Sequence, residues 1–201
     1  MNDNHKNWRL NDNLASLIHE RPIKTLDLGC AGGGLVQDLL SYGFEAIGLE
    51  GSNYNKNNQR WEWSVIPNNL FTCDISRPFT ILKDEQPMFF HVVMAWDVLE
   101  HMNNQERLDG ACQNIANHIL PHGYFICSMP ANEDGPVYGD PFWHHIHFTT
   151  QQWDDQFSKF GLTPVVTPLF WHPCGWLRGE DIDKCYRKIL KKSSVDKRLI
   201  I

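Results

Sequence analysis

A glycine-rich turn that follows a short apolar segment constrains this chain more than any other part of its sequence. Residues 24–28 (Lys-Thr-Leu-Asp-Leu) have the pattern of a buried strand, and the glycine-rich segment 29–34 comes directly after them. Apolar residues at helical spacing then follow, namely Leu35, Val36, Leu39 and Leu40. Glycine lets a ligand approach the backbone closely, and the start of a helix presents unpaired N–H groups. The strand, turn and helix therefore predict a site for a nucleotide-like ligand.

The spacing of the glycines excludes the two familiar phosphate-binding turns. A dinucleotide fingerprint needs Gly-x-Gly-x-x-Gly or Ala, but the third position from Gly29 is Ala31 and the sixth position from Gly32 is Gln37. The Lys-Ser or Lys-Thr pair of a P-loop does not follow the glycines either. Asp27, at the end of the strand, would repel a pyrophosphate and attract a cation. S-adenosylmethionine, which carries a sulfonium and an ammonium group and no phosphate, meets this requirement.

On these residues the chain resembles the class I S-adenosylmethionine-dependent methyltransferases, whose first motif is Asp/Glu-x-Gly-x-Gly-x-Gly. The matching positions are Asp27, Gly29, Ala31 and Gly33, so alanine replaces the second glycine. The resemblance covers roughly residues 20–165 and implies that these four residues and Cys30 bind S-adenosylmethionine. The alternative is a glycine-rich turn without a ligand.

Acidic residues end the next two predicted strands. Glu50, with Gly51 after it, lies about 20 residues beyond the glycine turn, where one carboxylate can accept from both hydroxyls of a ribose. The resemblance implies that Asp74, after the third strand, accepts from the adenine amino group and that Ile75 lines the base. The alternatives are a solvated loop acid for Glu50 and a helix cap for Asp74.

A second group of polar residues follows the fourth predicted strand, residues 89–96, whose last residue, Trp96, we expect beside the cofactor. The segment Asp97-Val98-Leu99-Glu100-His101 is similar to the metal-binding pattern Glu-x-x-Glu-His of the ubiquinone-pathway O-methyltransferases and the small-RNA 3′-terminal 2′-O-methyltransferases. Aspartate in place of the first glutamate is a departure from that pattern. Two carboxylates and an imidazole can hold a hard divalent cation, which lowers the pKa of a bound hydroxyl.

The resemblance implies that Asp97, Glu100, His101 and a later histidine, His144, hold a divalent cation such as magnesium. His145 and His147 are alternative later ligands, although His147 has a structural interpretation. Without a metal, Glu100 and His101 would cap the helix and shape the pocket, and a histidine would be the natural general base because its pKa lies near neutral pH. The candidate catalytic residues are His101 and His145.

Strands that alternate with helices predict an α/β fold, a three-layer, doubly wound, Rossmann-like and mostly parallel sheet. We expect a single domain: a helical lead at 1–22, a cofactor-binding core at 23–170 and a C-terminal extension at 171–201. Within it, residues 162–170 predict a strand interrupted by prolines, and residues 180–192 predict a final helix with acids leading and bases trailing.

Composition narrows the function further. The chain has 201 residues and a formal net charge of -6, which argues against general nucleic-acid binding. Its six scattered cysteines and polar N-terminus favour a cytoplasmic protein without a membrane span. We expect either a monomer or a homodimer. The sequence predicts a methyltransferase that uses S-adenosylmethionine on a hydroxyl of a small or sugar-like molecule. The alternatives are a metal-dependent RNA-end 2′-O-methyltransferase, supported by a basic last helix, a non-catalytic S-adenosylmethionine-binding module, and a different nucleotide enzyme.

Overall fold

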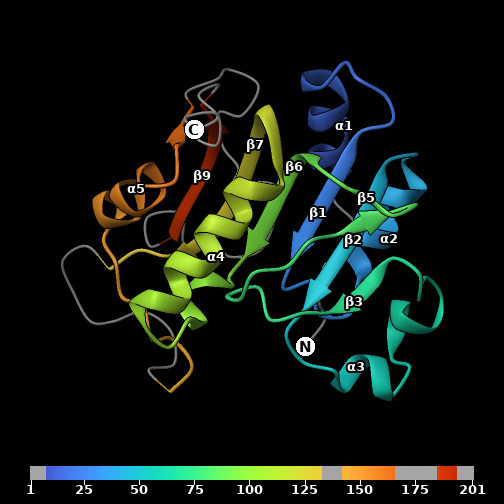
Figure 1. The fold of residues 1–201 in the computed structure, drawn as a ribbon, viewed down its shortest axis with the longest axis horizontal. Helices are drawn as coiled ribbons and strands as arrows, with labels where there is room; N and C mark the ends of the chain where they lie inside the picture. Colours follow the sequence, from blue (N-terminus) through green and yellow to red (C-terminus); the bar gives the residue numbers. More distant parts are fainter. Residues whose placement is uncertain (1–7, 133–141, 166–184, 194–201) are drawn as a thin grey trace.

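The computed structural model describes residues 8–132, 142–165 and 185–193. A seven-stranded sheet in the order β3-β2-β1-β6-β7-β9-β8 crosses this part of the chain (Figure 1). All of its strands run parallel except β9, which is antiparallel to both of its neighbours. The strands are β1 (Lys24–Leu28), β2 (Glu45–Glu50), β3 (Leu70–Thr72), β6 (Phe90–Trp96), β7 (Ile119–Pro130), β8 (Leu162–Pro164) and β9 (Cys185–Lys192).

Helices cover both faces of this sheet, as predicted for a three-layer α/β fold. The helices are α1 (Trp8–Leu17), α2 (Gly34–Ser41), α3 (Tyr54–Asn57), α4 (Gln105–His118) and α5 (Thr150–Ser158), with 3-10 turns η1 (Trp61–Ser64) and η2 (Leu99–His101). A small hairpin of β4 (Leu82–Lys83) and β5 (Gln86–Pro87), which the sequence pattern did not reveal, precedes β6.

The central strand β6 shows why the sheet is buried on both faces. Val93 and Ala95 belong to the core cluster that contains the apolar side chains of α4 and α5. Val92 and Met94 belong to the other cluster, together with those of α1 and α2. Since successive side chains of a strand point to opposite faces, a continuous apolar run is what a doubly covered strand requires.

The connection from β3 back to β6 creates the crevice that matters for function. The chain lays down β1, β2 and β3 outward in one direction and then returns to place β6 on the other side of β1. In open α/β sheets, ligands bind outside the carboxyl ends of the strands at such a reversal of strand order. The carboxyl ends of β1 and β6 therefore mark the expected site.

The final predicted helix is wrong. The described part of that segment, residues 185–192, forms β9, which pairs with β7 and β8. The adjacent residues Ile189 and Leu190 are buried in opposite core clusters, an alternation that a strand allows. The charge gradient suggested a helix, but insertion of the segment between two strands decided its structure. Residues 180–184 of that prediction lie outside the described residues.

Helix α4 is capped by Asn104, whose side-chain oxygen accepts from the Arg107 N–H. Thr149 and Gln152 form a capping box at the start of α5. Of the strand predicted at 162–170, the structure describes only β8 and one residue beyond it.

Within the described residues, no helix combines the length and the apolar character that crossing a bilayer requires.

Candidate functional site

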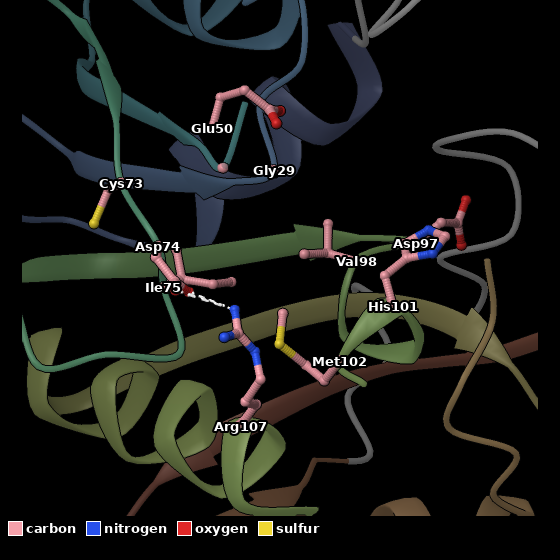
Figure 2. A pocket seen from close by; sticks show the side chains of 11 residues that line it. Gly29, Glu50, Cys73, Asp74, Ile75, Asp97, Val98, His101, Met102 and Arg107 are labelled. Carbon is pink, nitrogen blue, oxygen red and sulfur yellow. Dashed lines mark hydrogen bonds and ion pairs between the residues drawn. The ribbon is translucent and has the colours of Figure 1, made fainter. Parts of the chain in front are cut away.

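A cavity of about 400 Å³ opens at the carboxyl ends of β1, β2, β3 and β6. Figure 2 shows the side chains that line it, which come from four separate chain segments and from the start of α4. The lining residues are Gly29, Glu50, Gly51, Cys73, Asp74, Ile75, Asp97, Val98, His101, Met102 and Arg107. The structure thus brings together seven of the residues that the sequence predicted, and it places them at the expected reversal of strand order.

The glycine-rich segment 29–34 forms the turn that its sequence predicted, and several of its residues have positive φ. Gly29 has φ +69°, and a Cβ on it would lie 2.4 Å from a methyl group of Val98. Gly33 has φ +91° at the start of α2, where a Cβ would lie 2.6 Å from Leu70. Ala31 adopts φ +46°, a left-handed conformation that is uncommon for a residue with a Cβ. The alanine therefore takes a conformation suited to the glycine of the motif.

Glu50 joins the glycine turn to the cavity. One of its carboxylate oxygens accepts from the Ala31 N–H at 2.9 Å, and the other accepts from the Ser52 N–H at 3.0 Å. Each carboxylate oxygen has two lone pairs, so each can still accept one further hydrogen bond. A pair of neighbouring hydroxyls would find one free acceptor apiece.

Asp27 lies behind the cavity rather than in its wall. Its side chain is 1% exposed, and neither carboxylate oxygen has a hydrogen-bond partner among the described residues. Burial, and secondarily the charge of Glu50, raises the pKa of Asp27 to about 8. At neutral pH the carboxyl is therefore mostly protonated in this structure, and it attracts a cation less strongly than a free carboxylate would.

Cys30 and Trp96 also lie outside the cavity lining. The Cys30 side chain is fully buried in the core cluster of α1 and α2. Trp96 packs against the same cluster, and its indole N–H has no partner among the described residues. The Cys30 backbone remains in the glycine turn, so a cofactor role would involve its main chain.

Asp74 carries a dense set of contacts. Its Oδ1 accepts from the hydroxyl and N–H of Ser76, and both carboxylate oxygens lie 3.0 Å from Nη2 of Arg107. The Ser76 hydroxyl is the main reason that the pKa of Asp74 lies below its usual value, and Arg107 lowers it further. Asp74 is thus an anion in the cavity wall.

A second cavity, of about 630 Å³, adjoins the first. It is lined by His101, Met102, Asn103, Arg107, Trp143 and His145. His101, Met102 and Arg107 line both cavities and form the boundary between them. Trp143 is 60% exposed and packs edge-to-face with Phe142, which is 72% exposed. Flat apolar surface therefore lies beside the histidines.

His101 has a defined tautomer. Its Nδ1 lies 2.8 Å from the carbonyl oxygen of Trp143, and a carbonyl can only accept, so Nδ1 carries the hydrogen. In the neutral imidazole, Nε2 then has a free lone pair. The segment that supplies this carbonyl is itself held by η2, because His145 and Ile146 donate their N–H groups to the Glu100 carbonyl.

Glu100, His101 and His144 form a cluster of possible metal ligands. One ligand atom from each lies within 4.8 Å of the others. The Glu100 side chain is fully buried, and its two carboxylate oxygens have no hydrogen-bond partner among the described residues. Burial, and secondarily the charge of Asp97, raises the pKa of Glu100 well above its usual value. A buried, unpartnered carboxylate is costly, so a cation at this position would relieve it.

Asp97 and His145 are not members of that cluster, although both are close to Glu100. Asp97 accepts from the Ser128 hydroxyl at 2.8 Å and lines the first cavity. His145 lines the second cavity and has an exposed side chain. His147 is also exposed and lines neither cavity.

Four lining residues were missed by sequence reasoning, namely Cys73, Val98, Met102 and Arg107. Val98 and Met102 lie within and directly after the Asp97–His101 segment, so proximity to that motif was an available signal. Arg107 carried none, because a lone arginine in the first turn of a helix is ordinary on a solvated face.

Comparisons with known proteins agree with this geometry. A family described as a methyltransferase domain matches residues 4–168. The fold is similar to the CcbJ methyltransferase from Streptomyces caelestis, with 13% identity and a TM-score of 0.66 over 92% of this chain and 88% of that chain. It is also similar to 1,6-didemethyltoxoflavin-N1-methyltransferase from Burkholderia thailandensis, solved with 1,6-didemethyltoxoflavin and S-adenosylhomocysteine (17% identity, TM-score 0.62, 92% and 76% covered).

An O-methyltransferase of a trans-AT PKS multienzyme from Brevibacillus brevis, in complex with S-adenosyl-L-homocysteine, is similar at 21% identity and a TM-score of 0.59, with 77% of this chain and 51% of that chain covered. No curated protein matches the sequence. Because the family match covers most of the chain, and the fold and the crevice at its strand ends agree with it, this chain belongs to the methyltransferase domain family as a class I S-adenosylmethionine-dependent methyltransferase.

Proposed function

We propose that this protein methylates an oxygen atom of a small molecule, with the methyl donor in the first cavity and the acceptor in the second. The observation that carries this proposal is the position of His101, which lines both cavities and has a fixed tautomer. A group that accepts a proton from an attacking hydroxyl must lie where donor and acceptor meet.

The first cavity has the groups that an adenosyl ligand requires. Glu50 has one free acceptor position on each carboxylate oxygen for the ribose hydroxyls, and Asp74 and Ile75 lie in the wall where adenine would fit. Gly29 and Gly51 leave room for close approach. S-adenosylmethionine supplies a methyl group already activated on its sulfonium.

The second cavity suits a flat acceptor with a hydroxyl group. Trp143 offers an exposed indole face, and His145 and Asn103 offer hydrogen-bonding groups. His101 Nε2 can accept the hydroxyl proton while Nδ1 stays bonded to the Trp143 carbonyl. In small-molecule sites, aromatic side chains provide contact area and a few polar groups fix the orientation of the ligand.

Two measurements test the proposal. Calorimetry with S-adenosylhomocysteine should show saturable binding, and no binding would refute the proposed donor site. A panel of phenols, catechols and sugars with methyl-labelled S-adenosylmethionine should give an O-methylated product. His101→Gln should lower kcat without weakening S-adenosylhomocysteine, whereas binding without any transfer would favour the non-catalytic alternative.

A metal-assisted version of the same reaction is a second candidate, favoured by the buried and unpartnered carboxylate of Glu100. Glu100, His101 and His144 would hold the cation, which would lower the pKa of an acceptor hydroxyl. Asp97, which the sequence pattern also implies as a ligand, is not in this cluster, and one of its carboxylate oxygens accepts from the Ser128 hydroxyl. The RNA-end alternative loses one of its supports, because the expected basic helix is the strand β9 where it is described.

A titration with Mn²⁺, monitored through the electron paramagnetic resonance signal of the free ion, distinguishes the metal-assisted reaction from the metal-free one without an activity assay. If the cluster binds a cation, the protein should take up one equivalent, and Glu100→Gln should weaken that uptake at least tenfold. Glu106→Gln, which changes an exposed glutamate in the first turn of α4, is the matched control and should behave as the parent protein. Equal uptake by the Glu100→Gln variant, or no uptake by the parent, would refute the metal site.

A further inference from the structure

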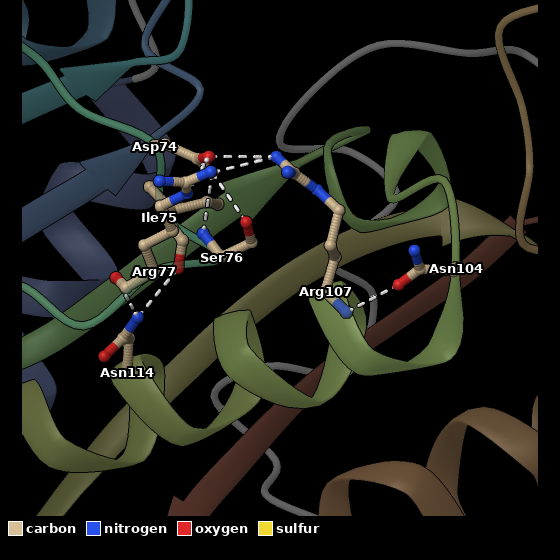
Figure 3. Close-up of polar contacts among 7 residues, drawn as sticks. All are labelled: Asp74, Ile75, Ser76, Arg77, Asn104, Arg107 and Asn114. Carbon is tan, nitrogen blue, oxygen red and sulfur yellow. Dashed lines mark hydrogen bonds and ion pairs between the residues drawn. The ribbon is translucent and has the colours of Figure 1, made fainter.

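Helix α4 contacts the loop of Asp74–Arg77 through three positions on one of its faces. Figure 3 shows two of them, Arg107 and Asn114. Arg107, Gly110 and Asn114 are spaced as i, i+3 and i+7, so they share a side of the helix. This loop supplies Asp74 and Ile75 to the first cavity. The helix therefore bears directly on the part of the wall that would meet adenine.

The contacts of Gly110 and Asn114 fix the backbone of the loop. A Cβ on Gly110 would lie 2.2 Å from the carbonyl oxygen of Ser76, so only glycine permits this approach. Asn114 is 5% exposed and donates its side-chain amide to the carbonyls of Ile75 at 2.9 Å and Arg77 at 2.7 Å. The loop directly follows β3 in the chain, and these contacts attach it to α4 as well.

The contact of Arg107 fixes the side chain of Asp74. Oδ1 already accepts from the Ser76 N–H, the Ser76 hydroxyl and Arg107, which exceeds its two lone pairs. Oδ2 accepts from Arg107 at 3.0 Å, and Arg77 lies farther away, at 3.5 Å. Oδ2 is thus the oxygen with capacity for one more donor. The bond to both oxygens restricts rotation of the carboxylate and defines which oxygen stays available.

We propose that Arg107 is a positioning residue for the methyl donor: it holds Asp74 so that Oδ2 can accept the adenine amino group, within a clamp completed by Gly110 and Asn114. This inference rests on the proposed placement of the adenosyl group. It predicts that Arg107 acts through Asp74 and that the pair selects a purine with a 6-amino group. A 6-oxo purine would place an acceptor against the carboxylate and leave both unpaired.

The experiment is a double-mutant cycle read by calorimetry with S-adenosylhomocysteine. Arg107→Gln and Asp74→Asn should each weaken binding about tenfold, because each removes a charge-assisted contact. The double variant should be no weaker than Asp74→Asn alone, since the two residues act on one group. Arg107→Lys should recover part of the affinity. Arg77→Gln is the matched control, because its exposed side chain reaches the same carboxylate only at 3.5 Å, and we expect less than a twofold change.

A second ligand, S-inosyl-L-homocysteine, reports selectivity rather than general damage. The parent protein should prefer S-adenosylhomocysteine, and that preference should shrink at least fivefold in Arg107→Gln and Asp74→Asn. Thermal melting verifies that the variants fold, as expected for an arginine whose side chain is 38% exposed.

Three outcomes would overturn the inference. Arg107→Gln could keep the affinity and selectivity of the parent protein, or the double variant could lose affinity by the product of the two single losses. Alternatively, the variants could bind both ligands more weakly with unchanged selectivity. Failure of the parent protein to bind S-adenosylhomocysteine would instead refute the proposed donor site itself.

Discussion

Asp27→Asn should change how the stability of this protein depends on pH. The carboxyl is 1% exposed without a hydrogen-bond partner among the described residues, and its pKa is about 8 in the folded state, against 3.8 for the free side chain. Between these values the folded protein keeps a proton that the unfolded chain has released. The stabilisation present below pH 3.8 is therefore lost progressively as the pH rises toward 8.

The magnitude follows from the size of that interval. Each pH unit between the two pKa values changes the free energy of unfolding by about 1.4 kcal/mol for one group, so the whole interval corresponds to roughly 6 kcal/mol. Asparagine has nearly the same shape and does not titrate. Between pH 5 and pH 7.5, the free energy of unfolding of the variant should therefore rise by roughly 3 kcal/mol relative to that of the parent. A pH-independent effect of the amide on stability does not change this rise.

Urea unfolding of both proteins at half-unit steps from pH 5 to pH 9 measures this difference. Subtracting the free energy of unfolding of the parent from that of the variant removes the contributions of the other titrating groups. This difference should rise with pH and level off above pH 8. Two parallel curves would refute the reasoning, because they would mean that Asp27 ionises in the folded state as it does in the unfolded chain.

Three further substitutions test other parts of the site. Gly29→Ala should destabilise the fold by about 2 kcal/mol in thermal melts and abolish S-adenosylhomocysteine binding, because φ is +69° and the new Cβ meets Val98; parental binding would contradict this. Glu50→Gln should weaken S-adenosylhomocysteine by about 2 kcal/mol in calorimetry, whereas Glu45→Gln, on the same strand but paired with Lys83, should leave affinity unchanged. Gly110→Ala should melt at a lower temperature despite the better helix propensity of alanine, since its Cβ meets the Ser76 carbonyl, and an increase in melting temperature would show that the loop yields easily.

Local pattern was sufficient for the core of the fold. The apolar run of β6 predicted a strand covered on both faces, and the glycine-rich segment after β1 predicted a tight turn. The structure has that turn, with left-handed backbone at Gly29 and Gly33. These features depend on interactions between residues near in sequence, or on burial that any partner can provide. The segment 185–192 shows the limit: its charge gradient favoured a helix, but its pairing with β7 and β8 made it a strand.

The same distinction applies to the site. The residue types at the ends of β1, β2 and β3 predicted which carboxylates would gather at one edge of the sheet, because parallel strands end there together. Sequence position could not show that Asp27 would be buried and protonated while Glu50 and Asp74 face the cavity.

What only the tertiary structure decided are contacts between segments distant along the chain. The Trp143 carbonyl selects the tautomer of His101, and Arg107 of α4 takes hold of Asp74 across 33 positions of sequence. The sequence by itself determined the mostly parallel, doubly wound sheet, through its alternating strands and helices, and the class of methyl donor, through the motif residues that follow each strand. The orientation of the reacting groups depends on distances and desolvation that arise when the layers pack, and no local pattern encodes them.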